Sequence, residues 1–108
     1  MVLKKITAIV RTKILETLER RLQNIGVTGI TVTRCGGYGK YESLVKFTWS
    51  WPRARIEIYC DSSKTEIIAE TIMEAAHTGT MGDGIIAIEP VDALYRIRTK
   101  AEALESEI

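Results

Sequence analysis

The sequence predicts an α+β fold made of two successive β-α-β units, and three observations support this prediction. The chain has 108 residues, 45% of them hydrophobic, with 15 Lys and Arg against 14 Asp and Glu, as is typical of one globular domain. A strand-like pattern, a helix-like pattern and a second strand-like pattern occur twice in the same order. Each helix-like pattern has a single apolar side, so both helices need a sheet to cover.

The first unit spans roughly the first third of the chain. Apolar residues alternate with polar ones from Lys4 to Arg11, which predicts a strand, although Ile9 breaks the alternation and needs a partner on the other face. Apolar residues then recur at helical spacing at Ile14, Leu18, Leu22 and Ile25. Gly26 ends this helix, and the β-branched run Thr28 to Cys35 predicts the second strand.

The second unit repeats this order. Alternation from Arg55 to Cys60 predicts a third strand. Ser63 to Glu66 has the form of a capping box, and an apolar stripe follows it, which predicts a helix ending near His77 or Gly79. The stripe consists of Ile68, Ile72, Ala75 and Ala76. After a glycine-rich turn, Ile85 to Glu89 predicts a fourth strand that Pro90 closes.

Right-handed crossovers place both helices on one face of the sheet. The compact arrangement of two such units is a four-stranded antiparallel sheet of ferredoxin-like type. Its other face stays uncovered, so Ile9 and its neighbours on that face call for a partner. The simplest partner is another copy of the chain.

Two stretches fall outside this scheme. The connection from Gly36 to Arg53 is longer than a hairpin needs, which is typical of a functional loop. Alternating apolar residues from Val45 to Trp51 allow the third strand to begin before Pro52. At the other end of the chain, Ala101 to Ile108 is rich in Glu and is expected to be a frayed helix or a tail.

Two features are candidates for binding a phosphate. The backbone N–H groups of the glycine-rich segment Thr78 to Gly84 can bind anionic oxygens, although such a segment can equally be a plain turn. Arg96 and Arg98 would share one side of an extended segment and form a paired donor set, or else belong to a solvated charged strand.

Other residues favour ordinary roles. The spacing of Gly36, Gly37 and Gly39 before Lys40 can wrap a phosphate or ribose but does not fit a dinucleotide fingerprint. Lone His77 fits a helix C-terminus better than a metal site, and Cys35 and Cys60 fit thiols in a reducing compartment. A net charge of +1 argues against nucleic acid, and the lack of a long apolar run predicts a cytoplasmic protein.

The order of several motifs resembles the PII signal-transduction family over nearly the whole chain. The motifs are Lys5-Ile6-Thr7-Ala8-Ile9-Val10-Arg11, Gly26-Val27-Thr28-Gly29-Ile30-Thr31-Val32-Thr33, Gly37-Tyr38-Gly39, Thr78-Gly79-Thr80-Met81-Gly82-Asp83-Gly84 and Tyr95-Arg96-Ile97-Arg98-Thr99. The resemblance implies a single domain over residues 1–108 that forms homotrimers and binds adenine nucleotides in clefts between subunits. It also implies a non-catalytic sensor whose T-loop, residues 36–53 here, docks on a transporter or metabolic enzyme, with 101–108 as a C-terminal tail.

The resemblance also implies a set of binding residues. Adenine and ribose would lie near Ile9, Gly29, Thr31, Gly37 and Thr78, and phosphates beside Gly39 and Lys40. Gly82, Asp83 and Gly84 would offer backbone contacts, and Arg96 and Arg98 would reach the phosphates from the adjacent subunit's side. Arg53 is a candidate anion contact.

Several positions depart from the family pattern. Thr80 and Ile85 replace lysines, which weakens charge neutralisation near the phosphates and predicts a preference for ADP or AMP over ATP. Tyr41 replaces the glutamine associated with magnesium and 2-oxoglutarate, which predicts that 2-oxoglutarate has no effect. The T-loop is shorter and lacks a counterpart of the modified tyrosine. The implied protein is a divergent PII-like sensor with bicarbonate as a further ligand, attached to membranes only through a partner.

Two other classes of function are compatible with the sequence. One is a slow nucleotide hydrolase in which Asp83 or Glu42 positions water, although the sequence offers no base–nucleophile pair. The other is a ferredoxin-like module for nucleic acid, a small ligand or a metal, since that fold carries many functions.

Overall fold

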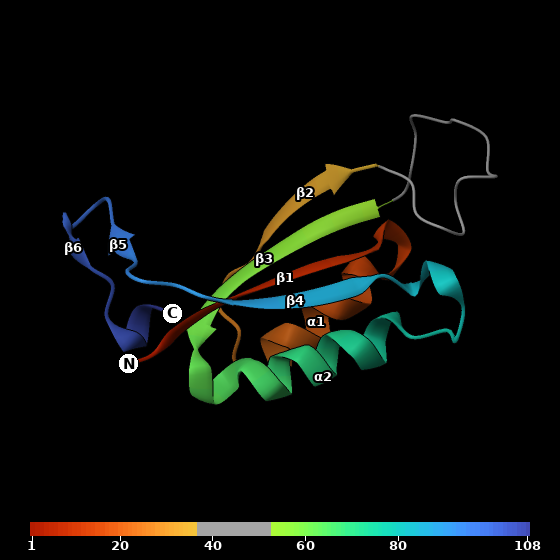
Figure 1. Cartoon of the computed structure of the whole chain (residues 1–108), viewed down its shortest axis with the longest axis horizontal. Coiled ribbons are helices and arrows are strands. Elements are labelled where there is room, and N and C mark those ends of the chain that lie inside the picture. Colours follow the sequence, from red (N-terminus) through yellow and green to blue (C-terminus); the bar gives the residue numbers. More distant parts are fainter. Residues whose placement is uncertain (37–52) are drawn as a thin grey trace.

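The computed structural model describes residues 1–36 and 53–108, which form one four-stranded sheet, two helices and a small hairpin (Figure 1). The strands are β1 (Leu3–Arg11), β2 (Thr31–Cys35), β3 (Arg53–Asp61), β4 (Ile85–Pro90), β5 (Tyr95–Arg96) and β6 (Ala101–Glu102). The helices are α1 (Leu15–Asn24) and α2 (Thr65–Ala76), and short 3-10 turns cover Thr12–Ile14, Ser62–Lys64, Met81–Asp83 and Glu105–Glu107. Neither helix of the described chain is long and apolar enough to span a bilayer.

The sheet has the predicted topology. Its order is β2-β3-β1-β4, and all three strand pairs are antiparallel. Both helices lie on one face of the sheet, which confirms the ferredoxin-like α+β prediction (Figure 1). The opposite face of the sheet carries no helix of the described chain.

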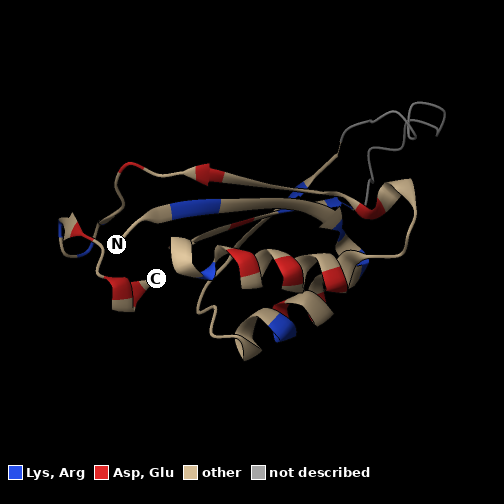
Figure 2. Cartoon of the chain, turned by 60° about the horizontal axis from the view of Figure 1, so that its bottom comes forward, with Lys and Arg blue, Asp and Glu red and all other residues tan. Residues whose placement is uncertain are grey.

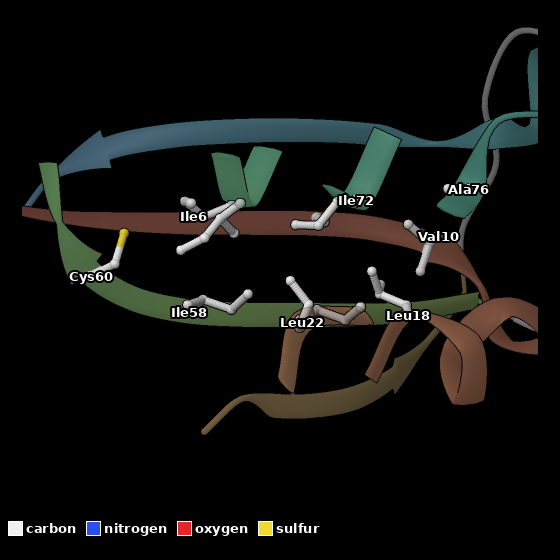
Figure 3. Close-up of a cluster of buried hydrophobic side chains, with 11 residues drawn as sticks. Ile6, Val10, Leu18, Leu22, Ile58, Cys60, Ile72 and Ala76 are labelled. Carbon is white, nitrogen blue, oxygen red and sulfur yellow. The ribbon is translucent and has the colours of Figure 1, made fainter. Parts of the chain in front are cut away.

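The core lies between the sheet and the helices (Figure 3). Alternation along β1 and β3 turns Ile6, Ala8 and Val10, together with Ile56 and Ile58, toward the helices, where all are at most 2% exposed. Leu18 and Leu22 from α1 and Ile68 and Ile72 from α2 meet them. The buried thiol of Cys60 closes one end of this core, and burial raises its pKa.

Helix α2 has a buried apolar side and an exposed acidic side. Glu66, Glu70 and Glu74 follow each other at four-residue spacing on its exposed side, and Figure 2 marks the acidic residues of this helix in red. The predicted capping box is wrong: Asp61 caps the preceding 3-10 turn by accepting from the Ser63 backbone N–H at 3.0 Å. Lys64, which precedes α2, makes no side-chain cap.

The second strand and the C-terminal segment differ most from the sequence predictions. Strand β2 begins at Thr31 and not at Thr28, because its pairing with β3 ends where Thr31 meets Glu57. The C-terminal segment is neither a frayed helix nor a loose tail. It forms β6 and the 3-10 turn Glu105–Glu107, and Ala103 between them is 7% exposed. The predicted extension of the third strand before Pro52 lies outside the described residues.

Candidate functional site

The glycine-rich segment between α2 and β4 is folded around the carboxylate of Asp83. That carboxylate accepts hydrogen bonds from the backbone N–H of Thr78 at 2.7 Å and of Gly79 at 2.8 Å, and from the Thr78 hydroxyl. Arg11 donates to the same carboxylate at 2.7 Å. These donors, led by the Thr78 hydroxyl, hold the pKa of Asp83 well below its usual range. Asp83 therefore shapes the segment through its side chain and stays ionised.

Two arginines from adjacent strands flank this segment. Arg11, at the end of β1, also donates to the Thr80 hydroxyl at 2.9 Å, and Arg53, at the start of β3, donates to the Gly82 carbonyl at 2.8 Å. A Cβ at Gly82 would overlap the Arg11 guanidinium, so a larger residue here would force that side chain to move. The buried Gly82 thus lies between two cations.

Arg11 was not among the sequence-predicted site residues. The signal that could have found it is the alternation in β1, which places Arg11 on the same face as Ile9. Its partner Asp83 lies 72 positions away along the chain, a separation that no local pattern reveals.

Gly84 sets the start of β4 against β1. Its φ is +109°, a backbone conformation that favours glycine, and a Cβ would overlap the carbonyl oxygen of Ile9. Ile9 pairs with Ile85 on one side and Arg55 on the other. It lies half-buried on the face of the sheet without helices, as predicted.

A second group of predicted residues borders a hollow of about 470 Å³ on that face. Gly29, Thr31 and Arg96 are among the residues that line it. Glu57 lines it as well, and Lys5 at 2.9 Å and Arg55 at 3.5 Å hold its carboxylate. The hydrogen bond from Lys5 lowers the pKa of Glu57, which keeps the carboxylate charged. Sequence reasoning missed Glu57, although its period-two spacing from Arg55 and Tyr59 signals their common face.

The prediction that Arg96 and Arg98 lie on one side of an extended segment is wrong. Arg96 belongs to β5, which pairs with β6, and residues 97–100 form the turn between them. Lys100 closes this turn at a φ of +57°. Both arginines are exposed beside the same shallow surface, but they come from a strand and a turn.

The structure thus divides the predicted residues between two places. Ile9, Thr78, Gly82, Asp83 and Gly84 gather with Arg53 at one end of the sheet. Gly29, Thr31 and Arg96 border the hollow near the β5–β6 hairpin, toward the other end (Figure 1). Gly37, Gly39 and Lys40 lie outside the described residues, as do Tyr41 and Glu42.

The positions of His77, Cys35 and Cys60 agree with the ordinary structural roles expected of them. His77 caps the end of α2 and is exposed, with Nδ1 3.8 Å from the Asp83 carboxylate. Cys35 is half-buried and Cys60 buried, and neither forms a disulfide. Within residues 1–36 and 53–108, no three His, Cys, Asp or Glu side chains cluster in a way that would hold a metal ion.

Asp83 is a poor general base for a hydrolase, because its low pKa disfavours taking up a proton.

Comparison with known proteins identifies the family to which this chain belongs. The family model described as "Nitrogen regulatory protein P-II" matches residues 3–101. The fold resembles that of the solved Arabidopsis thaliana PII bound to citrate, with a TM-score of 0.81 and 31% identity over 97% of this chain and 89% of the other.

Curated relatives give the same result. A nitrogen regulatory protein P-II of Azospirillum brasilense is 37% identical over 107 residues, covering 90% of this chain and 93% of the relative. Nitrogen regulatory protein P-II 2 of Methanothermobacter thermautotrophicus is 35% identical over 104 residues and 90% of each chain. These names describe regulatory proteins and not enzymes, in agreement with the sequence-based expectation. The chain therefore belongs to the nitrogen regulatory protein P-II family and is a regulatory signalling protein.

Proposed function

We propose that this protein is a cytoplasmic homotrimeric sensor that binds ADP or AMP in preference to ATP in clefts between subunits. Bicarbonate is the further small ligand, and the region 36–53 passes the signal to a transporter or metabolic enzyme. The observation that carries the proposal is the segment Thr78 to Gly84, which Asp83 holds in a fixed shape beside Arg11. The Arg11 guanidinium is the cation at this glycine-rich turn that an anionic ligand would share with Asp83.

The separation of the candidate residues supports a site shared between subunits. The start of β4, which Gly84 precedes, and strand β5, which carries Arg96, lie toward opposite ends of the chain (Figure 1), and this separation favours a site that a second subunit completes. A second copy seated on the open face of the sheet would bring one subunit's glycine-rich segment near the other's hollow. The exposed side chains of Ile85, at 67%, and Tyr59, at 40%, lie on this open face and would gain burial on assembly.

The preference for ADP or AMP rests on what borders the glycine-rich segment. Thr80 binds Arg11 through its hydroxyl and brings no charge, and Ile85 presents an exposed apolar side chain. A site with fewer cations gains less from the additional charge of a third phosphate. Because the positive charge is reduced here, we propose that ATP binds more weakly than ADP or AMP.

A small anion fits beside the same segment. Arg11 and Arg53 converge on Gly82 from β1 and β3, and arginine forks suit planar oxyanions such as carboxylates or bicarbonate. The Arabidopsis relative was solved with citrate, a molecule with carboxylates. The citrate bound to that relative supports a small anion as a further ligand of this protein.

Titration calorimetry with ATP, ADP and AMP, each with and without bicarbonate or 2-oxoglutarate, tests the proposal. We expect micromolar binding of ADP or AMP that bicarbonate changes and 2-oxoglutarate leaves unchanged. Ile85→Lys should raise the affinity for ATP about tenfold, because it adds one charge-assisted hydrogen bond. Gln23→Lys adds the same charge at an exposed position on α1 and serves as the control.

Two results would contradict the proposal. Tighter binding of ATP than of ADP by the parent protein would refute the preference. Absence of binding for all three nucleotides would refute the nucleotide site itself.

A further inference from the structure

The C-terminal segment Leu104–Ile108 folds back against the hollow that contains Gly29 and Thr31. Glu107 and Ile108 line this hollow together with Arg96. The segment is anchored on one side by Ala103, which is 7% exposed and whose backbone N–H donates to the Leu94 carbonyl at 2.8 Å. The chain therefore occupies part of the rim with its own backbone.

Arg96 is engaged by this segment. Its guanidinium donates a hydrogen bond to the backbone carbonyl of Glu107. A phosphate oxygen would require the same donors, and it would form a stronger hydrogen bond than a carbonyl because it is charged. The segment thus satisfies Arg96 with a weaker acceptor than the proposed ligand.

The segment is held in this shape by a local cap. The Glu107 carboxylate accepts from the Leu104 backbone N–H at 2.6 Å, while the Glu107 N–H donates to the Leu104 carbonyl at 2.9 Å. This reciprocal pair closes the 3-10 turn and fixes where the Glu107 carbonyl points. Without the Glu107 side chain, the turn loses one of its two closing hydrogen bonds.

We propose that the segment Leu104–Ile108 is a built-in competitor that occupies Arg96 and the rim of the hollow until a nucleotide phosphate displaces it. The inference rests on the proposed function, because it assigns the hollow to the nucleotide. A ligand that binds only the open form has its apparent affinity reduced by the fraction of chains that are open. Nucleotide binding and release of the segment are then one coupled event.

The first test compares two substitutions at one position by titration calorimetry with ADP. Glu107→Ala removes the acceptor that closes the turn, whereas Glu107→Gln removes the same charge but keeps an acceptor oxygen. We expect Glu107→Ala to bind ADP about three- to tenfold more tightly and Glu107→Gln to stay close to the parent, because the segment is closed in most free molecules. A chain ending at Ala103 should bind at least as tightly as Glu107→Ala.

A second readout follows the segment itself by hydrogen exchange. Saturating ADP should accelerate exchange of the Leu104, Glu107 and Ile108 amides in the parent protein, because their hydrogen bonds open when the segment leaves. Slower exchange of these amides with ADP would overturn the inference, since the segment would then be part of the bound site.

The possible outcomes separate the two proposals. Binding of ADP by the parent with unchanged affinity in Glu107→Ala and in the shortened chain overturns the competitor and leaves the nucleotide site standing. Weaker binding by the shortened chain also overturns it. Failure of both the parent and Glu107→Ala to bind ADP refutes the proposed function, and it refutes the inference about the C-terminal segment as well.

Discussion

At the scale of single residues, Asp83 organises the candidate site through its side chain. Its carboxylate joins the end of β1 to the glycine-rich segment by accepting from Arg11, Thr78 and Gly79. The same contacts lower the pKa of Asp83. A carboxyl group whose pKa is lower in the folded chain than in the unfolded chain stabilises the fold in its ionised form.

This link predicts how the stability of the fold depends on pH. Asp83 contributes its stabilisation fully above the ordinary Asp pKa of 3.8, and the contribution is lost as the pH falls toward its lower folded-state pKa. Asp83→Asn should therefore unfold at lower urea concentration than the parent at pH 7, and the difference should shrink below about pH 4. Urea unfolding at several pH values measures it.

Asp61 provides the internal control for this experiment. Its pKa is also lowered, first by the Ser63 hydroxyl, so the Asp83→Asn chain keeps part of the acid sensitivity. If the difference in unfolding urea concentration between parent and variant stays constant from neutral to acidic pH, the role given to Asp83 is contradicted.

Sequence reasoning located the important residues near the glycine-rich segment but misjudged how some of them act. It expected Asp83 to contribute its backbone, whereas the structure uses the carboxylate. The reason is physical: the partner Arg11 comes from the first strand, and the pairing of β1 with β4 brings it there only in the folded chain. Composition and spacing carry no information about such a distant partner.

At the scale of elements, periodicity was a good guide wherever an element was long. The alternation in β1 and β3 and the apolar stripes of α1 and α2 correspond to the buried faces in the structure. The short run at Tyr95 to Arg98 misled the prediction, because four alternating residues fit a strand and a strand followed by a turn equally well. The cap at Asp61 was missed because Ser63 offered a competing local pattern.

Helix α2 allows a direct measurement of what the buried stripe contributes. Ile72 is 1% exposed and its neighbour Met73 is 53% exposed. We expect Ile72→Ala to lower the free energy of unfolding by about 2–5 kcal/mol, because it removes buried apolar groups and leaves a cavity. Met73→Ala on the same helix should change it by no more than about 0.5 kcal/mol.

Urea denaturation monitored by circular dichroism gives both values. Equal losses of stability for the two variants would contradict the packing of α2, in which one side faces the sheet and the other faces away.

At the scale of the whole molecule, the sheet topology followed from the sequence and the assembly remains a proposal. Two β-α-β units with right-handed crossovers leave few compact arrangements, and the observed order β2-β3-β1-β4 is one of them. No sequence pattern, by contrast, specifies how copies of the open sheet face meet. The distribution of the candidate residues between two ends of the chain is what favours a shared site.

Mixed assemblies test whether the site is shared. Asp83→Ala should disable the glycine-rich segment and Arg96→Ala the hollow, so each variant alone should lose ADP binding. In a cyclic trimer that contains both variants, one cleft joins an intact segment to an intact hollow. Equal mixing should therefore restore about a quarter of the parent's sites.

Calorimetry after refolding the two variants together counts these sites, and separately refolded variants mixed without exchange serve as the control. Sedimentation should show a mass three times the 12.1 kDa of the chain. Loss of ADP binding that no mixture restores would contradict a site formed by two subunits.

The pairing of β2 with β3 has a practical consequence for engineering. Cys35 and Arg53 lie directly opposite each other in the antiparallel ladder, so the two described ends of the connection between β2 and β3 lie side by side. The register of this ladder depends on residues Thr31–Cys35 and Arg53–Glu57, not on the number of residues between them. We therefore expect a peptide tag inserted between these two strands to leave their register unchanged.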